Sequence, residues 1–241
     1  NGKTTSKELI AAVLSKKFKT YATKGNLNNH IGIPLTLLSI KSDAQFAVIE
    51  MGANHQGEIA SYCKYVKPDY GLITNVGLAH TEGFGGFEGV VKGKTELYRD
   101  IALRSGKIFI CADNELLVHS WQLSIGSNAN SITYGKAPSA FCKGESVSDT
   151  EFLSVVVEGM EIQTKLIGEY NFENVMSAVC IGKYFGVESE KIKQAIEEYV
   201  PSNNRSQKLT YGTNTIILDA YNANPSSMTE ALKNFDKIQS P

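Results

Sequence analysis

The feature that most constrains this chain is an alternation of apolar runs with helical patterns along its first two thirds. Three short and largely apolar runs, at 46–49, 72–76 and 108–111, have the character of strands covered on both faces of a sheet. The segments with apolar residues at helical spacing are 5–14, 58–66 and 87–103. Because this alternation indicates βαβ units, we expect an α/β fold with a mostly parallel sheet flanked by helices.

The part of the chain after residue 150 departs from this alternation. Two β-type runs, at 152–158 and 161–167, lie on either side of Gly159. A short turn between two such runs predicts an antiparallel hairpin, which we expect to be appended to the parallel sheet. Two helical patterns follow, over 172–185 and 189–199.

The stretch 201–206 (PSNNRS) is polar and begins with proline, so it is the best candidate for a linker. A strand pattern at 215–218 and a helical pattern from Ser226 come after it. One such βα unit is too small to form a domain alone. We therefore expect the start of a second domain here, of which the chain contains only a part.

Composition excludes several classes of protein. With 241 residues and 42% hydrophobic residues the chain can bury a core, and its net charge of -1 argues against intrinsic disorder. The balance of 24 basic and 25 acidic residues disfavours a broad nucleic-acid-binding surface, and no apolar run is long enough to span a bilayer. The four cysteines show no CxxC pairing, which favours reduced thiols and a cytoplasmic location.

The first residues, N-G-K-T-T, come directly before a helical pattern. Phosphate-binding loops end in G-K-[ST], where backbone N–H groups and the helix N-terminus hold phosphate oxygens. In such loops the lysine, here Lys3, reaches the phosphates, and the hydroxyl of the next residue, here Thr4, holds Mg²⁺. Only Gly2, Lys3 and Thr4 of that pattern are visible, so the motif alone is a weak signal.

Two further polar side chains follow predicted strands. Glu50 closes the run F-A-V-I-E, and His80 lies in a glycine-rich loop after the next strand. The carboxyl ends of parallel strands form the crevice in which α/β folds bind ligands, so both side chains could ligate a metal ion there. The alternatives are a glutamate that emerges into solvent and a structural or solvated histidine.

Lys94 lies on the apolar face of the pattern at 87–103, because it is three or four residues from Val90, Val91 and Leu97. Burying a bare ammonium is costly, so such a lysine pairs, loses its proton or is chemically modified. A neutral amine can add CO₂ to form a carbamate, which is anionic and able to ligate a metal ion. The alternative is a packed stem with the ammonium in water, and spacing alone does not decide between the two.

The remaining candidates are two asparagines at the start of a predicted helix and one aspartate at the end of a predicted strand. Asn171 and Asn174 stand at the start of the pattern at 172–185. By default Asn171 is an N-cap and Asn174 an exposed polar residue, although their amides could instead read the edge of an adenine. Asp219 ends the strand T-I-I-L-D, and its carboxylate could accept hydrogen bonds from ribose hydroxyls or belong to a turn.

Taken together, seven motifs resemble the Mur ligase family, and most closely its D-alanyl-D-alanine-adding branch. They occur in the family's order and span nearly the whole chain. The motifs are NGKTT (1–5), NLNNHIGIP (26–34), EMGANHQGEI (50–59), NVGLAHTEGFG (75–85), KGKTELY (92–98), GEYNFEN (168–174) and DAYNANPSSM (219–228). The EMGAN and YNANP stretches are the ones specific to that branch.

The resemblance implies a P-loop-type fold divided into two parts. Residues 1–203 would be the central ATP-binding domain, beginning inside its phosphate loop. Residues 204–241 would be a linker and the first βα unit of a Rossmann-like C-terminal domain.

The resemblance also implies roles for individual side chains. The residues that would contact ATP are Gly2, Lys3, Thr4, Thr5, Asn171, Asn174, Arg205 and Asp219. The ligands of two Mg²⁺ ions would be Thr4, Glu50, His80 and a carbamylated Lys94. The residues that would take part in catalysis are Lys3, His80 and Lys94. The context N-N-R-S around Arg205 departs from the family's usual G-R, so Arg205 is a weaker assignment than Asp219.

The activity so implied is ATP-dependent amide formation in peptidoglycan precursor synthesis. D-Alanyl-D-alanine would be added to UDP-N-acetylmuramoyl-tripeptide through an acyl phosphate, by a monomer that inserts into no membrane and binds no nucleic acid. The alternatives are another Mur branch, a ligase like folylpolyglutamate synthase, or a nucleotide-binding module that has no activity by itself.

Overall fold

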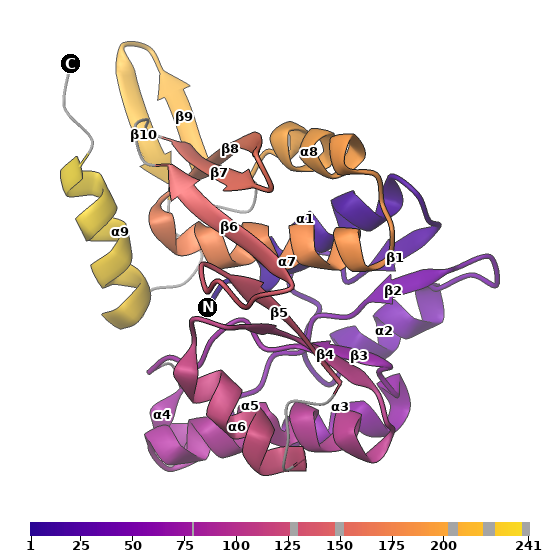
Figure 1. The fold of residues 1–241 in the computed structure, drawn as a ribbon. Helices are drawn as coiled ribbons and strands as arrows, with labels where there is room; N and C mark the ends of the chain where they lie inside the picture. Colours follow the sequence, from indigo (N-terminus) through magenta and orange to yellow (C-terminus); the bar gives the residue numbers. More distant parts are fainter. Residues whose placement is uncertain (79, 126–129, 148–151, 202–206, 219–224, 238–241) are drawn as a thin grey trace.

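The computed structural model describes residues 1–78, 80–125, 130–147, 152–201, 207–218 and 225–237. Figure 1 shows a central sheet between two layers of helices. This arrangement confirms the α/β fold that the alternating pattern predicts, since helices cover both faces of the sheet.

The main sheet has six strands in the order β3-β4-β5-β6-β7-β8. These strands are β3 (Tyr70–Leu72), β4 (Lys107–Cys111), β5 (Ser131–Gly135), β6 (Cys142–Val147), β7 (Phe152–Val157) and β8 (Met160–Ile167). The strands from β3 to β6 pair in parallel, while β6, β7 and β8 pair antiparallel. The predicted hairpin is therefore present and continues the parallel sheet.

A second, smaller pair of strands lies beside the main sheet. It consists of β1 (Thr20–Ala22) and β2 (Phe46–Val48), which pair in parallel. The run at 72–76 was expected to be a strand, but β3 ends at Leu72. The residues after Leu72 instead line a cavity, which is described below.

The helices divide between the two faces of the sheet. On one face lie α1 (Lys3–Ser15), α7 (Phe172–Tyr184) and α8 (Ser189–Glu198). On the other face lie α3 (Glu58–Val66), α5 (Phe87–Leu103) and α6 (Glu115–Ile125). The short helices α2 (Gly32–Ser39) and α4 (Thr81–Phe84) complete this region. Helix α7 packs on β4, β5 and β6, and α5 packs on β3 and β4.

The largest core cluster holds α1 in place against the sheet and against α7. Leu9 and Val13 of α1 and Val175 and Val179 of α7 are almost completely buried in it. A Cβ at Gly182 of α7 would lie 2.5 Å from Cγ1 of Val13, so only glycine allows the two helices to approach this closely. Because the first turn of α1 is the predicted phosphate-binding element, this packing fixes its position.

The last described elements are β9 (Gln207–Tyr211), β10 (Asn214–Leu218) and α9 (Pro225–Lys237). The predicted strand and the predicted helix are both present, as β10 and α9. The sequence did not predict β9, nor that β10, the strand of the βα unit, pairs antiparallel with it in a hairpin.

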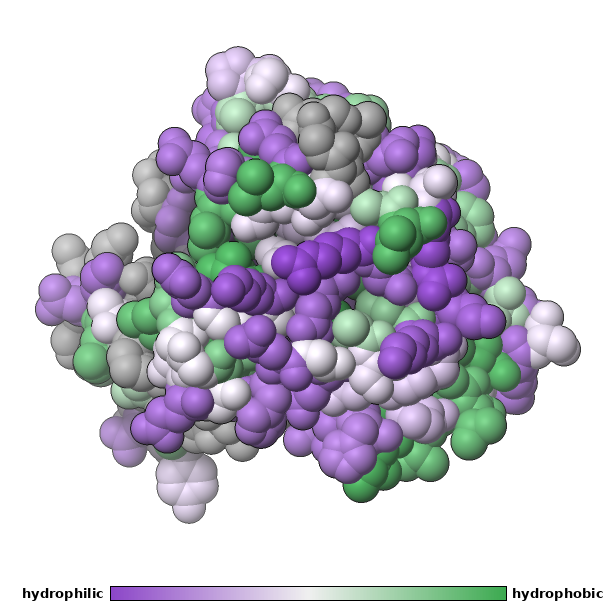
Figure 2. Space-filling model, turned by 90° about the horizontal axis from the view of Figure 1, so that it is seen from below, coloured by the Kyte–Doolittle hydropathy of each residue, from purple (hydrophilic) through white to green (hydrophobic). Residues whose placement is uncertain are grey.

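The face at the bottom of Figure 1, where α3, α5 and α6 lie, is shown in Figure 2. It is mostly hydrophilic, with apolar side chains in separate patches. This is expected of amphipathic helices that turn their apolar stripe to the sheet. Among the described residues, no helix combines the length and apolar character needed to cross a membrane.

Candidate functional site

The site begins at the N-terminus of α1. Gly2 precedes this helix with φ at 74°, and no side chain caps the first turn. The first turn contains no acidic residue. The first N–H groups of a helix have no partner within the helix, and the helix dipole favours an anion beside them. The start of α1 is therefore suited to hold a phosphate, as the G-K-T motif predicts.

Gly2 and Ser6 join this helix start to α7. A Cβ at Gly2 would lie 2.4 Å from Oδ1 of Asn174, which is closer than real Cβ contacts. The hydroxyl of Ser6 donates a hydrogen bond of 2.9 Å to the same oxygen. Two segments far apart in the sequence therefore meet at a point where only glycine fits.

Asn174 and Asn171 form a short relay of hydrogen bonds behind this contact. Nδ2 of Asn174 donates to Oδ1 of Asn171 at 2.9 Å, and Nδ2 of Asn171 donates to the carbonyl oxygen of Ile167 at 2.9 Å. Asn171 is 3% exposed and Asn174 is 6% exposed. Asn171 does occupy the N-cap position of α7, but its side chain makes no capping hydrogen bond. The default interpretation of Asn174 as an exposed residue was wrong, because its side chain is buried.

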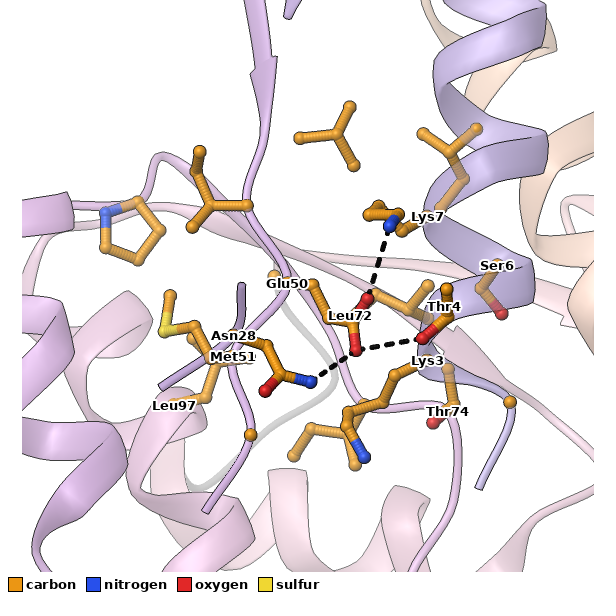
Figure 3. A pocket seen from close by; sticks show the side chains of 18 of the residues that line it. Lys3, Thr4, Ser6, Lys7, Asn28, Glu50, Met51, Leu72, Thr74 and Leu97 are labelled. Atoms are coloured by element: carbon orange, nitrogen blue, oxygen red, sulfur yellow. Dashed lines mark hydrogen bonds and ion pairs between the residues drawn. The ribbon is translucent and has the colours of Figure 1, made fainter. Parts of the chain in front are cut away.

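Glu50 is the buried acid of the site. Its Oε1 accepts hydrogen bonds from the hydroxyl of Thr4 at 3.1 Å and from Nδ2 of Asn28 at 2.7 Å. The backbone N–H of Glu50 donates to Oγ1 of Thr23 at 3.0 Å, which fixes the end of the strand segment. Figure 3 shows the carboxylate between Asn28, Thr4 and Lys7. Glu50 therefore does not emerge into solvent, as the alternative interpretation required.

The same carboxylate is suited to a metal ion. Its second oxygen, Oε2, is buried and accepts no hydrogen bond, although the ammonium of Lys7 lies 3.5 Å away. The Thr4 hydroxyl and the Glu50 carboxylate are the hard oxygen donors that Mg²⁺ prefers. Within the described part of the chain, no three His, Cys, Asp or Glu side chains are grouped around a common point. An ion here would thus need water or ligand oxygens, as Mg²⁺ commonly does.

Lys94 is half-buried on α5 rather than extended into water. Its ammonium donates to the carbonyl oxygen of Ala53 at 3.3 Å and lies 5.4 Å from the centre of the Phe84 ring. Burial, helped by the positive charge of Lys3, lowers the pKa of Lys94 to about 8. The lowered pKa increases the fraction of this amine that is neutral near physiological pH, and the neutral amine is the form that adds CO₂.

Glu96, two residues after Lys94 on α5, binds the start of α3. Its carboxylate accepts hydrogen bonds from the backbone N–H groups of Gly57 at 2.5 Å and Ala60 at 2.9 Å. An acid at the start of α3 also complements the helix dipole. These hydrogen bonds join α5 to the start of α3, which directly follows the loop that contains Ala53. They therefore help to hold α5, which carries Lys94, next to the carbonyl oxygen to which Lys94 donates.

His80 also lines the cavity, and it directly precedes the short helix α4. Its backbone is left-handed, with φ at 61°. Burial of the ring, followed by the positive charges of Lys94 and Lys3, lowers the pKa of His80 below its ordinary value. A neutral imidazole is the form that ligates metal ions.

We expect the imidazole of His80 to titrate below pH 6.5 and its pKa to rise in Lys94→Met, because a repelling positive charge is removed. An NMR titration of the His80 ring protons checks this. The control is Lys64→Met, which removes an exposed charge from α3. A pKa of His80 that is unchanged in Lys94→Met would contradict the interaction between the two side chains.

The sequence-predicted residues converge in one cavity of about 1380 Å³. This exceeds the roughly 300–1,000 Å³ of a usual small-molecule pocket, so the cavity can hold a large ligand or two ligands. The predicted site residues that line it are Gly2, Lys3, Thr4, Thr5, Glu50, His80, Lys94, Asn171 and Asn174. Arg205 and Asp219 lie outside the described residues.

Sequence reasoning missed three polar residues of the cavity lining whose contacts with predicted site residues are described above. They are Ser6, Lys7 and Asn28. Lys7 carries one signal that the sequence does show, because it lies one helical turn after Lys3 and is thus on the same face of α1. Asn28 and Ser6 act through contacts with distant segments, for which the sequence offers no spacing rule.

The fold and this cavity define an α/β protein of the P-loop type, with a phosphate-loop helix at the carboxyl edge of its strands. The family model of the Mur ligase middle domain matches residues 1–182. The chain therefore belongs to the Mur ligase family, whose middle domain it contains.

Individual relatives agree with this assignment. The chain is 36% identical to the UDP-N-acetylmuramoyl-tripeptide–D-alanyl-D-alanine ligase of Haemophilus influenzae, over 99% of this chain and 54% of that protein. It superposes on MurF from Acinetobacter baumannii with a TM-score of 0.89 and 30% identity, over 99% of this chain and 53% of that one. The fold also matches MurF of Thermotoga maritima in complex with ADP, with a TM-score of 0.84, 22% identity, and coverage of 100% and 56%.

The chain spans about half the length of the curated relatives that it matches.

Proposed function

We propose that residues 1–203 are the ATP-binding domain of a ligase that adds D-alanyl-D-alanine to UDP-N-acetylmuramoyl-tripeptide. Residues 204–241 would be the linker and the start of its C-terminal domain. The protein would act as a cytoplasmic monomer. The relatives that carry this name match almost the whole chain, which supports the proposal.

The observation that carries the proposal is the direct contact between Thr4 and Glu50 inside the shared cavity. A hydroxyl at the start of a phosphate-binding helix and a buried acid beside it are the pair that holds Mg²⁺ in P-loop enzymes. Lys3 lines the same cavity and supplies a positive charge for the phosphates.

The proposed reaction has two steps. The terminal carboxylate of the tripeptide attacks the γ-phosphorus of ATP, which forms an acyl phosphate and releases ADP. The amine of D-alanyl-D-alanine then attacks the acyl carbon, loses a proton and expels inorganic phosphate, which leaves an amide. The carboxylate and the triphosphate are both anionic, so positive charge must neutralise them before they can meet. Lys3 supplies part of this charge.

Mg²⁺ at Thr4, Glu50 and His80 would supply the rest, since divalent cations neutralise phosphate oxygens and orient them. Lys94 would serve as a carbamate, formed by its neutral amine and CO₂, and would offer two oxygens to a second cation. Its pKa of about 8 and its place in the cavity support this role.

The adenine would lie against Asn171 and Asn174. Both amides line the cavity at its α7 wall, and each NH₂ group retains one hydrogen beyond those used in the relay. Arg205 and Asp219 would reach the nucleotide from the linker and the C-terminal domain.

We expect the protein, supplied with ATP, Mg²⁺ and UDP-N-acetylmuramoyl-tripeptide, to release inorganic phosphate only when D-alanyl-D-alanine is added. A coupled phosphate assay measures this, and mass spectrometry identifies the extended muramoyl peptide. Single amino acids and folate substrates serve as controls, because they would reveal another Mur branch or a folylpolyglutamate-type ligase. Turnover with one of these and none with D-alanyl-D-alanine would contradict the proposed substrate.

The second candidate function is a nucleotide-binding module without activity of its own. The observation behind this candidate is that the family model matching residues 1–182 is that of a middle domain. Calorimetry of residues 1–241 with ATP and Mg²⁺ tests it, because this function requires binding heat without phosphate release.

A further inference from the structure

Lys7 is a buried lysine that the proposed reaction does not use. Its side chain is 4% exposed, and the side chain of Glu50 beside it is 2% exposed. Burying an ammonium group without compensation is strongly unfavourable, so a lysine in this place requires partners.

Three oxygen atoms surround the Lys7 ammonium. It donates a hydrogen bond to the carbonyl oxygen of Gly25 at 3.0 Å. Its distance to Oε2 of Glu50 is 3.5 Å, and its distance to Oε1 of Glu8 is 3.7 Å. The Glu8 carboxylate is itself engaged, since Oε2 accepts a hydrogen bond from the hydroxyl of Tyr199 at 2.6 Å. Of the two acids that face Lys7, Glu50 is the more deeply buried, because its side chain is 2% exposed and that of Glu8 is 22% exposed.

The two oxygens of the Glu50 carboxylate have different surroundings. Thr4 and Asn28 donate to Oε1, while Lys7 faces Oε2 from the opposite side (Figure 3). Lys7 thus places a positive charge 3.5 Å from the oxygen of Glu50 that accepts no hydrogen bond. Without Lys7, an ionised Glu50 carboxylate would be buried with two neutral donors at Oε1 and would lose the ammonium that faces Oε2.

A divalent cation at Glu50 would compete with this lysine. Both would share one carboxylate within a few ångströms, in an interior where charges interact more strongly than in water. The lysine therefore offsets part of the attraction between the carboxylate and the ion. It also keeps the carboxylate ordered when no ion is bound.

We propose that Lys7 is a positioning residue that serves as the built-in counter-ion of Glu50. It orders this carboxylate in the metal-free protein and keeps the affinity for a divalent cation low enough for the ion to exchange. This inference rests on the proposed function, because it takes Glu50 as a ligand of Mg²⁺.

The test uses Mn²⁺ as the probe, and free Mn²⁺ is counted by electron paramagnetic resonance in the absence of nucleotide. Lys7→Met keeps the stem of the side chain and removes its charge, so we expect the Kd of Mn²⁺ to fall at least about tenfold. We also expect Lys7→Met to unfold at a lower temperature without Mn²⁺ and to regain more stability with it than the wild type.

The matched control is Lys16→Met, which removes a lysine at the opposite, C-terminal end of α1, where it forms an exposed ion pair with Glu198. The net charge changes equally, but neither Lys16 nor Glu198 lines the cavity, so the Kd should stay within about twofold. Glu50→Gln should abolish the site in wild type and in Lys7→Met.

Each result decides between defined outcomes. Binding that depends on Glu50 but has the same or a higher Kd in Lys7→Met overturns the counter-ion role and leaves the ligase proposal intact. The counter-ion role is also overturned, and the ligase proposal left intact, if neither the wild type nor Lys7→Met binds Mn²⁺ in the absence of nucleotide. Binding that survives Glu50→Gln instead contradicts the proposed metal site itself.

If Lys7→Met does not fold, the double variant Lys7→Met/Glu50→Gln decides. Removing both charges together leaves no fully buried carboxylate without a cation, since Glu8 is 22% exposed and keeps its hydrogen bond from Tyr199, so a folded double variant supports the inference. An unfolded double variant overturns it, because the stem and the Gly25 contact would then be the essential features.

Discussion

Replacing Lys94 by alanine is expected to lower turnover in the ligase assay by about 10³-fold or more. The substitution removes the amine that would carry the carbamate, and with it an anionic ligand in the cavity. Because the backbone of α5 is unchanged and the residue is only half-buried, the protein should stay folded. Small carboxylic acids such as formate should restore part of the rate, since they can occupy the vacated space and offer two oxygens.

Lys92→Ala is the matched control for this experiment. It removes a lysine from the same helix, but that side chain is exposed and away from the cavity. Its turnover should equal that of the wild type. Full activity of Lys94→Ala would rule out a metal-ligand role for Lys94, and a rate loss that no carboxylic acid restores would contradict the carbamate.

Replacing Gly2 by alanine is expected to cost about 2–5 kcal/mol of stability and to abolish detectable ATP binding. The backbone at this position has φ at 74°, which an L side chain adopts only with strain. The new Cβ would also lie 2.4 Å from Oδ1 of Asn174. To relieve that contact, Asn174 must leave the hydrogen bond from Ser6, or the start of α1 must shift.

The control variant Gly25→Ala separates the effect of backbone strain from the effect of the close contact with Asn174. Gly25 also has a positive φ, of 53°, but nothing lies within 4 Å of its ideal Cβ. This control should cost only about 1 kcal/mol and leave ATP binding unchanged. Urea denaturation measures the stabilities and calorimetry measures the binding. Equal losses of stability in both variants would mean that backbone strain alone matters and that the Asn174 contact does not.

How much of the fold could be predicted differs between elements for physical reasons. The bounds of α3 and α5 agree with the sequence prediction because a glycine precedes each helix and an apolar stripe follows. Helix α2 was missed, since its residues are apolar nearly all round and show no helical period. The run at 72–76 was taken as a strand, but its later part leaves the sheet, where the hydroxyl of Thr74 donates to the carbonyl oxygen of Asn1 at 2.8 Å.

The site likewise contains residues that the sequence could predict and contacts that it could not. Glu50, His80 and Lys94 could be singled out, because each stands in a recognisable position relative to a strand or an apolar stripe. The contacts of Asn28 and Lys7 with Glu50 could not, since they depend on how separate segments fold onto one another. The sequence shows which residue types are available, whereas the pairing of their atoms depends on packing distances that no periodicity encodes.

The burial of the Lys7–Glu50 pair has a consequence for changes in ionic strength. Mobile ions screen charges that are in contact with solvent, and they screen buried charges much less. With side chains only 4% and 2% exposed, this pair is screened much less than charges at the surface. A rise in ionic strength would therefore weaken the long-range attraction between the protein and the anionic ligands proposed for the cavity, while the internal balance at the carboxylate would change little.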